Sequence, residues 1–286
     1  MDNITIVLVS FFSKHHIIRL CKKLHKYKVI IVENSNDLSL KKILKKKNIK
    51  IFFPSKNLGY GCGNNYAIAK SKTKKVLILN PDVNISQKSI EHLIKESNKI
   101  KNYGILFPRL NSLESNKMFE VEKRKIIEIN YKFVGKNIVS GCGMLINIEK
   151  LKKIGFFDKK IFLYKEETDL IKRCNDSSIK CYTLKNSKIS HFGSQSHNNK
   201  ISLEAELFRN WHWMWSNFYF YKKHFGIFYA IIKFFKKIIS MYIKKNIYFF
   251  LNNKKYKICE SRFNGLISSM LNKKSSYRMK IKNFNI

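Results

Sequence analysis

The sequence is poor in proline, glycine and acidic residues. Its 286 residues include only three prolines and eleven glycines, which excludes collagen-like and low-complexity chains. Apolar residues make up 44% of the chain, enough to bury a large core, and this argues against intrinsic disorder. The length suits one large domain or a domain with an appendage.

The sequence has no paired cysteine motif, and its first apolar segment is unlike a signal peptide. The six cysteines form no C-x-x-C pair, so in a chain of this length we expect reduced thiols of a cytoplasmic protein rather than a disulfide scaffold. The apolar segment Ile4–Val9 is short and follows Asp2. It therefore predicts a first β-strand rather than a signal peptide.

Acidic residues number 19 against 57 lysines and arginines, and the net charge is +38. Only seven of the basic residues are arginine, whereas surfaces that bind nucleic acid favour the guanidinium fork. Abundant Lys, Ile and Asn fit the codon drift of an AT-rich genome better. We therefore predict no nucleic-acid partner, although a basic nucleic-acid-binding protein is the main alternative from another class. Such a surface would still attract anionic membranes and phosphorylated substrates.

Short runs rich in β-branched residues alternate with helical patterns over the first hundred residues. These runs are Ile4–Val9, Val29–Val32, Ile49–Phe53 and Val76–Leu79. Ser13 and Ser86 are placed to cap two of the helices. The alternation predicts an α/β fold with a Rossmann-like, mostly parallel sheet flanked by helices. In such sheets ligands bind beyond the carboxyl ends of the strands, so polar residues there are candidate site residues.

We divide the chain into residues 1–103 and 104–202, which form the two halves of one α/β domain, and a basic, aromatic helical extension, 203–286. Residues 226–251 of the extension are apolar, but their five lysines exclude a simple spanning helix. Lys233, Lys237 and Lys244 share one helical face. This pattern fits a helix lying on an anionic membrane surface. A helix packed on the rest of the protein fits it equally well.

Polar and glycine-rich segments follow three of the predicted strands. Glu33 comes after the second strand, where a carboxylate can accept hydrogen bonds from a nucleoside. Residues 57–65 after the third strand contain three alternate glycines, which allow close backbone approach before a helix N-terminus that attracts anions. Asp82, in Asn80-Pro81-Asp82, follows the fourth strand. A carboxylate there suits Mg²⁺ or Mn²⁺ shared with a diphosphate.

Two further candidates lie in the second half of the chain. Glu166, Glu167 and Asp169 open a predicted helix, a conspicuous cluster in so acid-poor a chain. Acids complement the dipole at a helix N-terminus, and neighbouring carboxylates raise one another's pKa, which suits a general base. His191 can serve as a metal ligand if it meets Asp82 across a site.

The order and spacing of these elements resemble family 2 glycosyltransferases of the GT-A fold, and most closely the bacterial rhamnosyltransferase-like branch. The matching elements are Val9–Ser13, Val32–Ser35, Asn57–Gly59, Gly63-Asn64, Leu79–Asp82, Ser140–Ile146, Gly155–Asp158, Glu166–Leu170 and His191. Three further segments are similar to the helical C-terminal extension of that branch: Arg209-Asn210, Lys223–Gly226 and Arg262–Leu266. The resemblance covers nearly the whole chain.

The resemblance implies a role for each candidate residue. The donor-nucleotide residues would be Ser10, Glu33, Asn57, Gly59, Asn80 and Asp82. Asn80 and Asp82 stand at the first and last positions of the metal-binding D-x-D motif, and His191 is similar to a histidine that completes metal coordination. Glu167 falls at the catalytic acid and Glu166 just before it, which leaves open which of the two is the base. Asp169 matches an acid that binds the acceptor.

The same resemblance implies the reaction and its partners. The protein would be an inverting, metal-dependent hexosyltransferase using Mg²⁺ or Mn²⁺. It would move a sugar, with rhamnose as first candidate, from a dTDP- or UDP-sugar to a glycan or lipid-linked acceptor in cell-surface polysaccharide assembly. We expect it in the cytoplasm or peripherally on the inner face of the cell membrane. A GT-A-like binding protein without catalytic activity is the other alternative.

Overall fold

The computed structural model describes residues 4–134, 136, 138–191 and 202–279. The chain divides into two units, one of Met1–Asp158 with Glu166–Asn198 and one of Lys159–Lys165 with Asn199–Ile286. The first unit contains both predicted halves of the α/β domain apart from residues 159–165 and 199–202, which belong to the second unit. Its β6 begins at Tyr103 and continues the same sheet across the predicted 103/104 boundary.

The first unit is built from strands and helices in alternation. Its strands are β1 (Ile4–Ser10), β2 (Lys28–Glu33), β3 (Ile49–Phe52), β4 (Lys75–Leu79), β5 (Val83–Ile85), β6 (Tyr103–Leu110), β7 (Ile126–Ile129), β8 (Gly143–Asn147) and β9 (Lys180–His191). Its helices are α1 (Lys14–Lys23), α2 (Ser39–Ile43), α3 (Gly59–Lys70), α4 (Gln87–Lys99), α5 (Leu113–Glu122), α6 (Ile148–Lys152) and α7 (Glu166–Asp176), with a 3₁₀ turn at Tyr131–Phe133.

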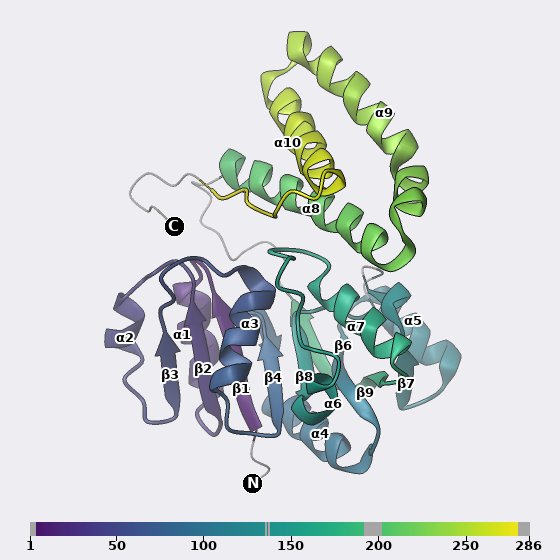
Figure 1. Ribbon diagram of the computed structural model, residues 1–286. Coiled ribbons are helices and arrows are strands. Elements are labelled where there is room, and N and C mark those ends of the chain that lie inside the picture. The colour runs from purple at the N-terminus through teal and green to yellow at the C-terminus, as the bar shows by residue number, and fades with distance from the viewer. Residues whose placement is uncertain (1–3, 135, 137, 192–201, 280–286) are drawn as a thin grey trace. The chain divides into compact units, whose positions relative to one another are not determined.

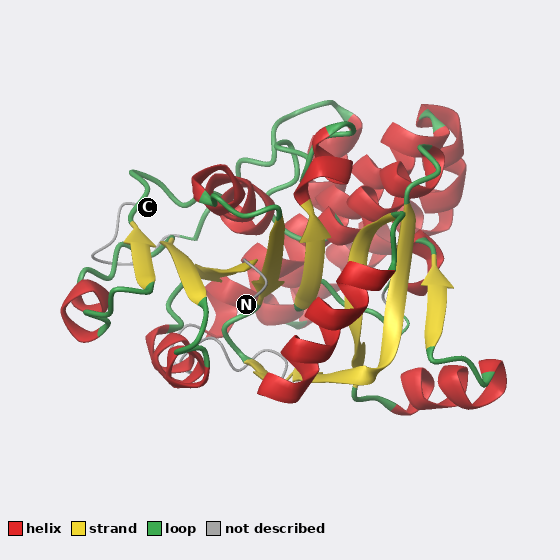
Figure 2. Ribbon diagram, turned by 90° about the horizontal axis from the view of Figure 1, so that it is seen from below, coloured by secondary structure: helices red, strands yellow, loops and turns green. Residues whose placement is uncertain are grey.

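The described strands form one mixed sheet in the order β3-β2-β1-β4-β8-β6-β9-β5, and β7 also pairs with β9. The pairs within β3-β2-β1-β4 are all parallel, as predicted. Beyond β4 the sheet is mixed, because β8 runs antiparallel to both β4 and β6 while β6 and β9 are parallel. Figures 1 and 2 show the strands side by side with helices on both faces. The α/β fold prediction is confirmed.

Alternating side chains of the strands supply two cores. Ile4, Ile6 and Leu8 of β1 pack on one face with buried side chains of α1, α2 and α4. Val7 and Val9 point to the other face, where α3, α6 and α7 cover the sheet. This alternation is the period-2 geometry of a strand. Both faces are covered, and β1 is therefore buried along its whole length.

Helix α3 begins earlier than its apolar pattern predicted. The glycine-rich segment is already helical from Gly59, whereas we expected the helix N-terminus to follow residues 57–65. A Cβ at Gly63 would lie 3.0 Å from Val9 of β1, so the glycine allows helix and strand to pack closely. Of the two predicted caps, Ser86 Oγ accepts from Ser89 N–H and caps α4. Ser13 occupies the N-cap position of α1 but makes no capping bond, because its hydroxyl turns to Ser10 and to Phe11 N–H.

Strand β9 changes partners along its length. Its first part pairs with β7 from Cys181 to Leu184, and its last part pairs with β5 from Ile189 to His191. Between them the register with β6 shifts, since Pro108 pairs with Leu184 but the next residue, Arg109, pairs with Lys188. This bulge-like irregularity lets one strand reach both neighbours. It carries His191 to the start of β5.

The second unit is helical. It contains α8 (Ser202–Phe225), α9 (Ile227–Leu251) and α10 (Asn253–Met270), and Figure 1 shows α9 and α10 as a hairpin. Gly226, with φ of 87°, makes the turn between α8 and α9, and Asn252 caps α10. Side chains of all three helices, among them Phe218, Phe234 and Leu266, form its core. Within the described residues, no helix combines the length and apolarity that a bilayer crossing needs.

Segment 159–165 belongs to this second unit although it lies between two elements of the first. Phe162 stacks on His212 of α8 with ring centroids 4.9 Å apart. Ser216 Oγ donates to the carbonyl of Leu163 at 2.7 Å. The sequence pattern did not indicate this association.

All six cysteines are free, in line with the expectation of reduced thiols.

Candidate active site

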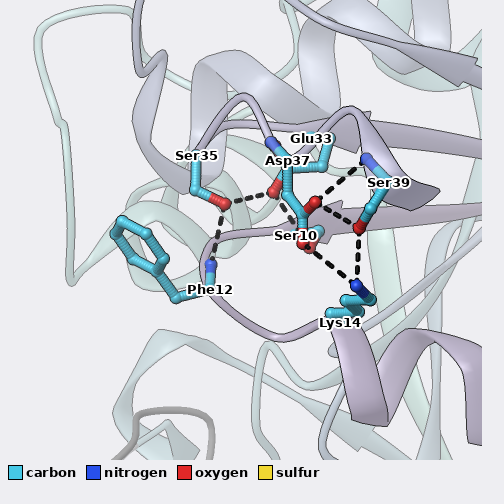
Figure 3. Close-up of polar contacts among 7 residues, drawn as sticks. All are labelled: Ser10, Phe12, Lys14, Glu33, Ser35, Asp37 and Ser39. Atoms are coloured by element: carbon cyan, nitrogen blue, oxygen red, sulfur yellow. Dashed lines mark hydrogen bonds and ion pairs between the residues drawn. The ribbon is translucent and has the colours of Figure 1, made fainter. Parts of the chain in front are cut away.

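Glu33 lies at the carboxyl end of β2 and binds the turns that follow β1 and β2. Figure 3 shows its carboxylate between the hydroxyls of Ser10 and Ser35. Its other oxygen accepts from Asp37 N–H at 2.7 Å, and Ser35 Oγ accepts from Phe12 N–H at 3.1 Å. Burial raises the pKa of Glu33, and hydrogen bonds from Ser35 and Asp37 offset part of this effect. The two turns are therefore held together at the sheet edge.

The next side chain, Asn34, connects β2 to the start of α3. Its amide nitrogen donates to Gly59 O at 3.1 Å, and its oxygen accepts from Leu58 N–H at 3.2 Å. Asn57 Oδ1 accepts from Gly59 N–H at 2.9 Å, an Asx turn. Gly59 has φ of 75°, a left-handed conformation that favours glycine. Asn57 and Gly59 thus shape the backbone at the N-terminus of α3.

Asp82 and His191 lie side by side. Antiparallel pairing of β5 with β9 sets Val83 opposite His191, and His191 Nε2 is 3.1 Å from Asp82 Oδ1. Burial alone would raise the pKa of Asp82, but the hydrogen bond and charge of His191 outweigh it, with a smaller contribution from His16, and lower the pKa below its usual value. The carboxylate is therefore ionised near neutral pH.

The oxygen and nitrogen atoms around Asp82 fit a divalent cation. Asn80 Oδ1 is buried and has no hydrogen-bond partner among the described residues. With Asp82 and His191 it offers two oxygens and one imidazole nitrogen, a donor set that Mn²⁺ accepts. No group of three or more His, Cys, Asp or Glu side chains able to hold a metal occurs in the described part of the chain. Any cation would need further oxygen ligands, such as those of a diphosphate.

Glu166 and Glu167 begin α7 and lie against two glycines. A Cβ at Gly61 would lie 3.2 Å from Glu166 Cγ, and one at Gly141 would lie 3.2 Å from Glu167 Cδ. Glu166 is buried, its Oε1 has no partner among the described residues, and Glu167 is half-buried. Burial raises the pKa of Glu166 well above its usual value, and the charge of Glu167 adds to the effect.

Tyr60 stands beside both glutamates and was not a candidate from the sequence. Its hydroxyl donates to Gly141 O at 2.6 Å. Burial raises the Tyr60 pKa well above its usual value, and the charges of Glu167 and Glu166 raise it further. Its place in the glycine-rich segment was the only signal, and local spacing could not reveal a partner at position 141.

Asp169 has a structural partner. The side chain is fully buried, and its Oδ2 accepts from Arg173 Nε at 2.8 Å. Arg173 also donates to the carbonyls of Ile154, Gly155 and Phe156. Asp169 therefore orients an arginine that holds the turn after α6. The acceptor-binding role expected from the sequence stays a prediction.

Residues 140–142 connect Asp82 and His191, here called the Asp82 pair, to Glu166 and Glu167. Cys142 O accepts from Asn80 N–H at 2.9 Å, while Gly141 contacts Glu167. Charges of both Asp82 and Glu167 act on the Cys142 thiol, whose pKa rises to about 12 mainly through burial. The structure thus brings Asn80, Asp82, His191, Glu166 and Glu167 to one region at the carboxyl edge of the sheet. Ser10, Glu33, Asn57 and Gly59 lie farther along this edge, at the ends of β1 and β2 and the start of α3.

The model of the family described as "Glycosyl transferase family 2" matches residues 6–155, more than half of the 286 residues. The chain belongs to glycosyl transferase family 2. The match covers β1 to β8 and ends before the glutamates of α7.

Curated relatives of this family 2 chain are glycosyltransferases at low identity. The low-salt glycan biosynthesis hexosyltransferase Agl10 of Haloferax volcanii is 24% identical over 63% of this chain and 64% of its own length. The match therefore spans just under two thirds of that relative. Rhamnosyltransferase WbbL of Escherichia coli is 24% identical over 72% of this chain and 88% of its own length.

A solved structure of similar fold is the mannosyltransferase PcManGT from Pyrobaculum calidifontis, in complex with GDP-Man and Mn²⁺. It aligns over 95% of this chain and 88% of its own with a TM-score of 0.58 and 9% identity. The likeness confirms the GT-A-like architecture with a helical C-terminal region.

Proposed function

We propose that this family 2 protein is an inverting, metal-dependent glycosyltransferase that moves a sugar from a nucleoside diphosphate to a hydroxyl of a glycan or lipid-linked acceptor. The observation that carries the proposal is the meeting of two groups at residues 140–142. Asn80 N–H donates to Cys142 O, and Asp82, which pairs with His191, acts on the Cys142 thiol by its charge. Glu167 lies against Gly141 in the same segment, and Glu166 precedes it in α7.

At the donor end, Ser10 and Glu33 would bind the nucleoside. Both residues lie at the carboxyl ends of parallel strands, β1 and β2, where such sheets bind their ligands. Asn57 and Gly59 would contact the nucleotide at the N-terminus of α3, where backbone N–H groups favour anions.

Asn80, Asp82 and His191 would hold Mg²⁺ or Mn²⁺ at the donor diphosphate. When bound, the cation would neutralise charge that develops on the departing nucleoside diphosphate. The ionised state of Asp82 and the buried, unpartnered oxygen of Asn80 support this role. The Mn²⁺ that accompanies GDP-Man in the PcManGT complex supports the choice of a divalent ion.

Glu167 is our choice for the general base. Its side chain is only half-buried, whereas Glu166 is buried and its raised pKa favours the protonated form. Glu167 would take the proton of the acceptor hydroxyl as the oxygen attacks the anomeric carbon. The acceptor oxygen forms its bond on the face opposite the nucleoside diphosphate as the bond to that leaving group breaks, and this single displacement inverts the configuration at the anomeric carbon.

The donor and acceptor are proposed by class. The name of the WbbL relative supports rhamnose as the first sugar to test. We propose thymidine diphosphate as its carrier on the family resemblance alone. The glycan biosynthesis named for Agl10 supports a glycan acceptor. Asp169 is buried, so it would act on the acceptor through Arg173 and the carbonyls of Ile154, Gly155 and Phe156 that Arg173 holds.

The test uses the full chain with dTDP-rhamnose, UDP-glucose and GDP-mannose, each with Mn²⁺, Mg²⁺ or a chelator. We expect one donor to raise the melting temperature only with metal, and to release its nucleoside diphosphate slowly as water replaces the acceptor. Glu167→Gln should keep the thermal shift and lose about 10²–10⁴ in turnover. Exposed Glu149→Gln on α6 is the matched control.

Near-normal turnover of Glu167→Gln would refute the base assignment. No response to any donor, together with salt-sensitive DNA or RNA binding, would favour the nucleic-acid alternative. Donor binding without metal-dependent turnover would favour an inactive GT-A-like binding protein.

A further inference from the structure

Helix α9 is apolar on two opposite faces. Ala230, Phe234 and Met241 are buried in the core that α9 shares with α8 and α10. The opposite side carries exposed apolar residues at spacings of mostly three and four, and these form the outer stripe: Phe228, Ile232, Phe235, Ile239, Ile243 and Phe250. A helix that covers a core is normally polar on that side. Packing within its own unit therefore does not explain the outer stripe.

The outer stripe is large and its residues are well exposed. Phe228 is 81% exposed, Ile232 76% and Phe250 84%. Contiguous apolar surface of this kind marks an interaction site more often than chance exposure does. The two phenylalanines stand near the two ends of the helix, so the stripe runs along most of its length.

Lysines lie along one side of the outer stripe. Lys233, Lys236, Lys237 and Lys244 are all exposed, and at 100° per residue they fall between the outer stripe and the buried face. We call these four the lysine border. Helix α9 contains no Asp or Glu, and no acidic residue occurs between Glu206 and Glu260. The surface beside the stripe is therefore strongly positive.

We propose that α9 docks in the plane of an anionic lipid bilayer. The outer stripe enters the boundary between headgroups and acyl chains, and the lysine border contacts lipid phosphates. Long lysine stems can lie along apolar surface while their ammonium groups stay at the headgroups. An amphipathic helix with aromatic and aliphatic residues on one side and lysines beside them has the composition of an interfacial helix.

The positive charge beside the outer stripe favours an anionic bilayer over other partners of α9. A second copy of the chain would bring two lysine borders together, and like charges repel. A helix crossing the bilayer is disfavoured because lysines would enter the hydrocarbon, in agreement with the lack of a spanning helix among the described residues. An anionic surface matches both the stripe and its border.

This inference does not rest on the proposed glycosyltransferase activity, since vesicle binding needs neither donor nor metal. It extends that proposal, because a protein held on a bilayer can meet a lipid-linked acceptor at the surface.

The experiment is flotation of the full chain with vesicles of phosphatidylcholine alone or with about one third phosphatidylglycerol. We expect flotation with the anionic vesicles and a loss of binding as salt rises. The stripe variant Phe228→Ser, Ile232→Ser and Phe235→Ser should bind at least about tenfold more weakly, because apolar burial supplies much of the affinity. The border variant, with Gln at all four lysines, should lose the preference for anionic vesicles.

Two matched controls separate specific from general effects. The apolar control removes two exposed apolar residues of α5, by Leu113→Ser and Val121→Ser. The charge control replaces four exposed lysines outside α9 with Gln and so removes the same charge: Lys41, Lys42, Lys45 and Lys101. Both should float like the unaltered chain, and circular dichroism should show every variant folded. The proposal is overturned by equal flotation of the stripe variant and the unaltered chain. It is also overturned by absence of flotation, or by a concentration-dependent dimer that the stripe variant abolishes.

Discussion

The hydroxyl of Tyr60 donates a 2.6 Å hydrogen bond to the carbonyl of Gly141, across 81 positions of sequence. This bond ties the start of α3 to the segment between the Asp82 pair and the glutamates. Burial raises the Tyr60 pKa, and the charges of Glu167 and Glu166 raise it further, so the phenol keeps its proton and stays a donor. Tyr60 thereby positions the peptide that Glu167 contacts.

Tyr60→Phe should leave the ring in place, because its edge contact with Phe157 needs no hydroxyl. We expect the free energy of unfolding to fall by about 1 kcal/mol, the usual cost of one lost hydrogen bond. Nucleoside diphosphate release should slow several-fold while donor affinity is kept, because the displaced segment borders the base. Tyr66→Phe on the same helix is the control. Unchanged stability and turnover in Tyr60→Phe would show that the bond has no positioning role.

Glu166→Gln should stabilise the protein at high pH. The folded-state pKa of Glu166 is raised, so between its ordinary value near 4.5 and the raised value the unfolded chain binds fewer protons than the folded one. The free energy of unfolding therefore falls as pH rises through that window, and a neutral glutamine removes this loss. Thermal melts should give similar midpoints for both proteins near pH 4.5 and a higher midpoint for Glu166→Gln at pH 8. A constant difference at all pH values would contradict the assignment.

His212 should make the helical unit sensitive to acid. Its Nε2 donates to Tyr277 O at 2.9 Å, which leaves Nδ1 to accept from Ser275 Oγ at 3.0 Å, so the ring is neutral. Burial, assisted by the charge of Arg278, lowers the His212 pKa to about 3 despite the bond to Tyr277. The unfolded chain binds the proton near the ordinary value of 6.5, so stability is complete above that pH and declines toward pH 3.

All three tryptophans lie in α8, so their fluorescence reports this transition. His212→Gln should flatten the decline between pH 6.5 and 3, at some cost in stability at pH 8. Exposed His15→Gln should change neither. An unchanged acid transition in His212→Gln would refute the assignment.

Gly265→Ala should destabilise the crossing of α8 and α10. A Cβ at Gly265 would lie 2.2 Å from the backbone oxygen of Trp211, which cannot move aside as a flexible side chain could. Helix propensity alone would favour alanine by about 1 kcal/mol, whereas overpacking typically costs about 1–3 kcal/mol. We expect a net loss, measured by denaturant unfolding followed by tryptophan fluorescence. Exposed Asn264→Ala is the control, and a gain for Gly265→Ala would contradict the close crossing.

The sequence predicted the strands and the helix cap that depend on neighbouring residues alone. The four N-terminal strands agree with the structure to within one or two residues, because β-branched runs between turn residues are strong strand signals. Ser86 caps α4 as its position indicated. The early start of α3 was missed, because its glycines fit positions where a Cβ would crowd Val9, Phe157 and Glu166, and spacing does not reveal these neighbours.

The order of amino acids alone was enough to predict the alternation of strands and helices, the parallel pairing around β1, and the kinds of chemical group that follow each strand. Which of these groups meet depends on the folded arrangement. The irregularity in β9 brings His191 to Asp82, α3 brings Tyr60 to Gly141, and segment 159–165 joins the helical unit. Propensity and capping act over a few neighbouring residues, whereas strand register and helix packing depend on contacts between side chains far apart in the chain.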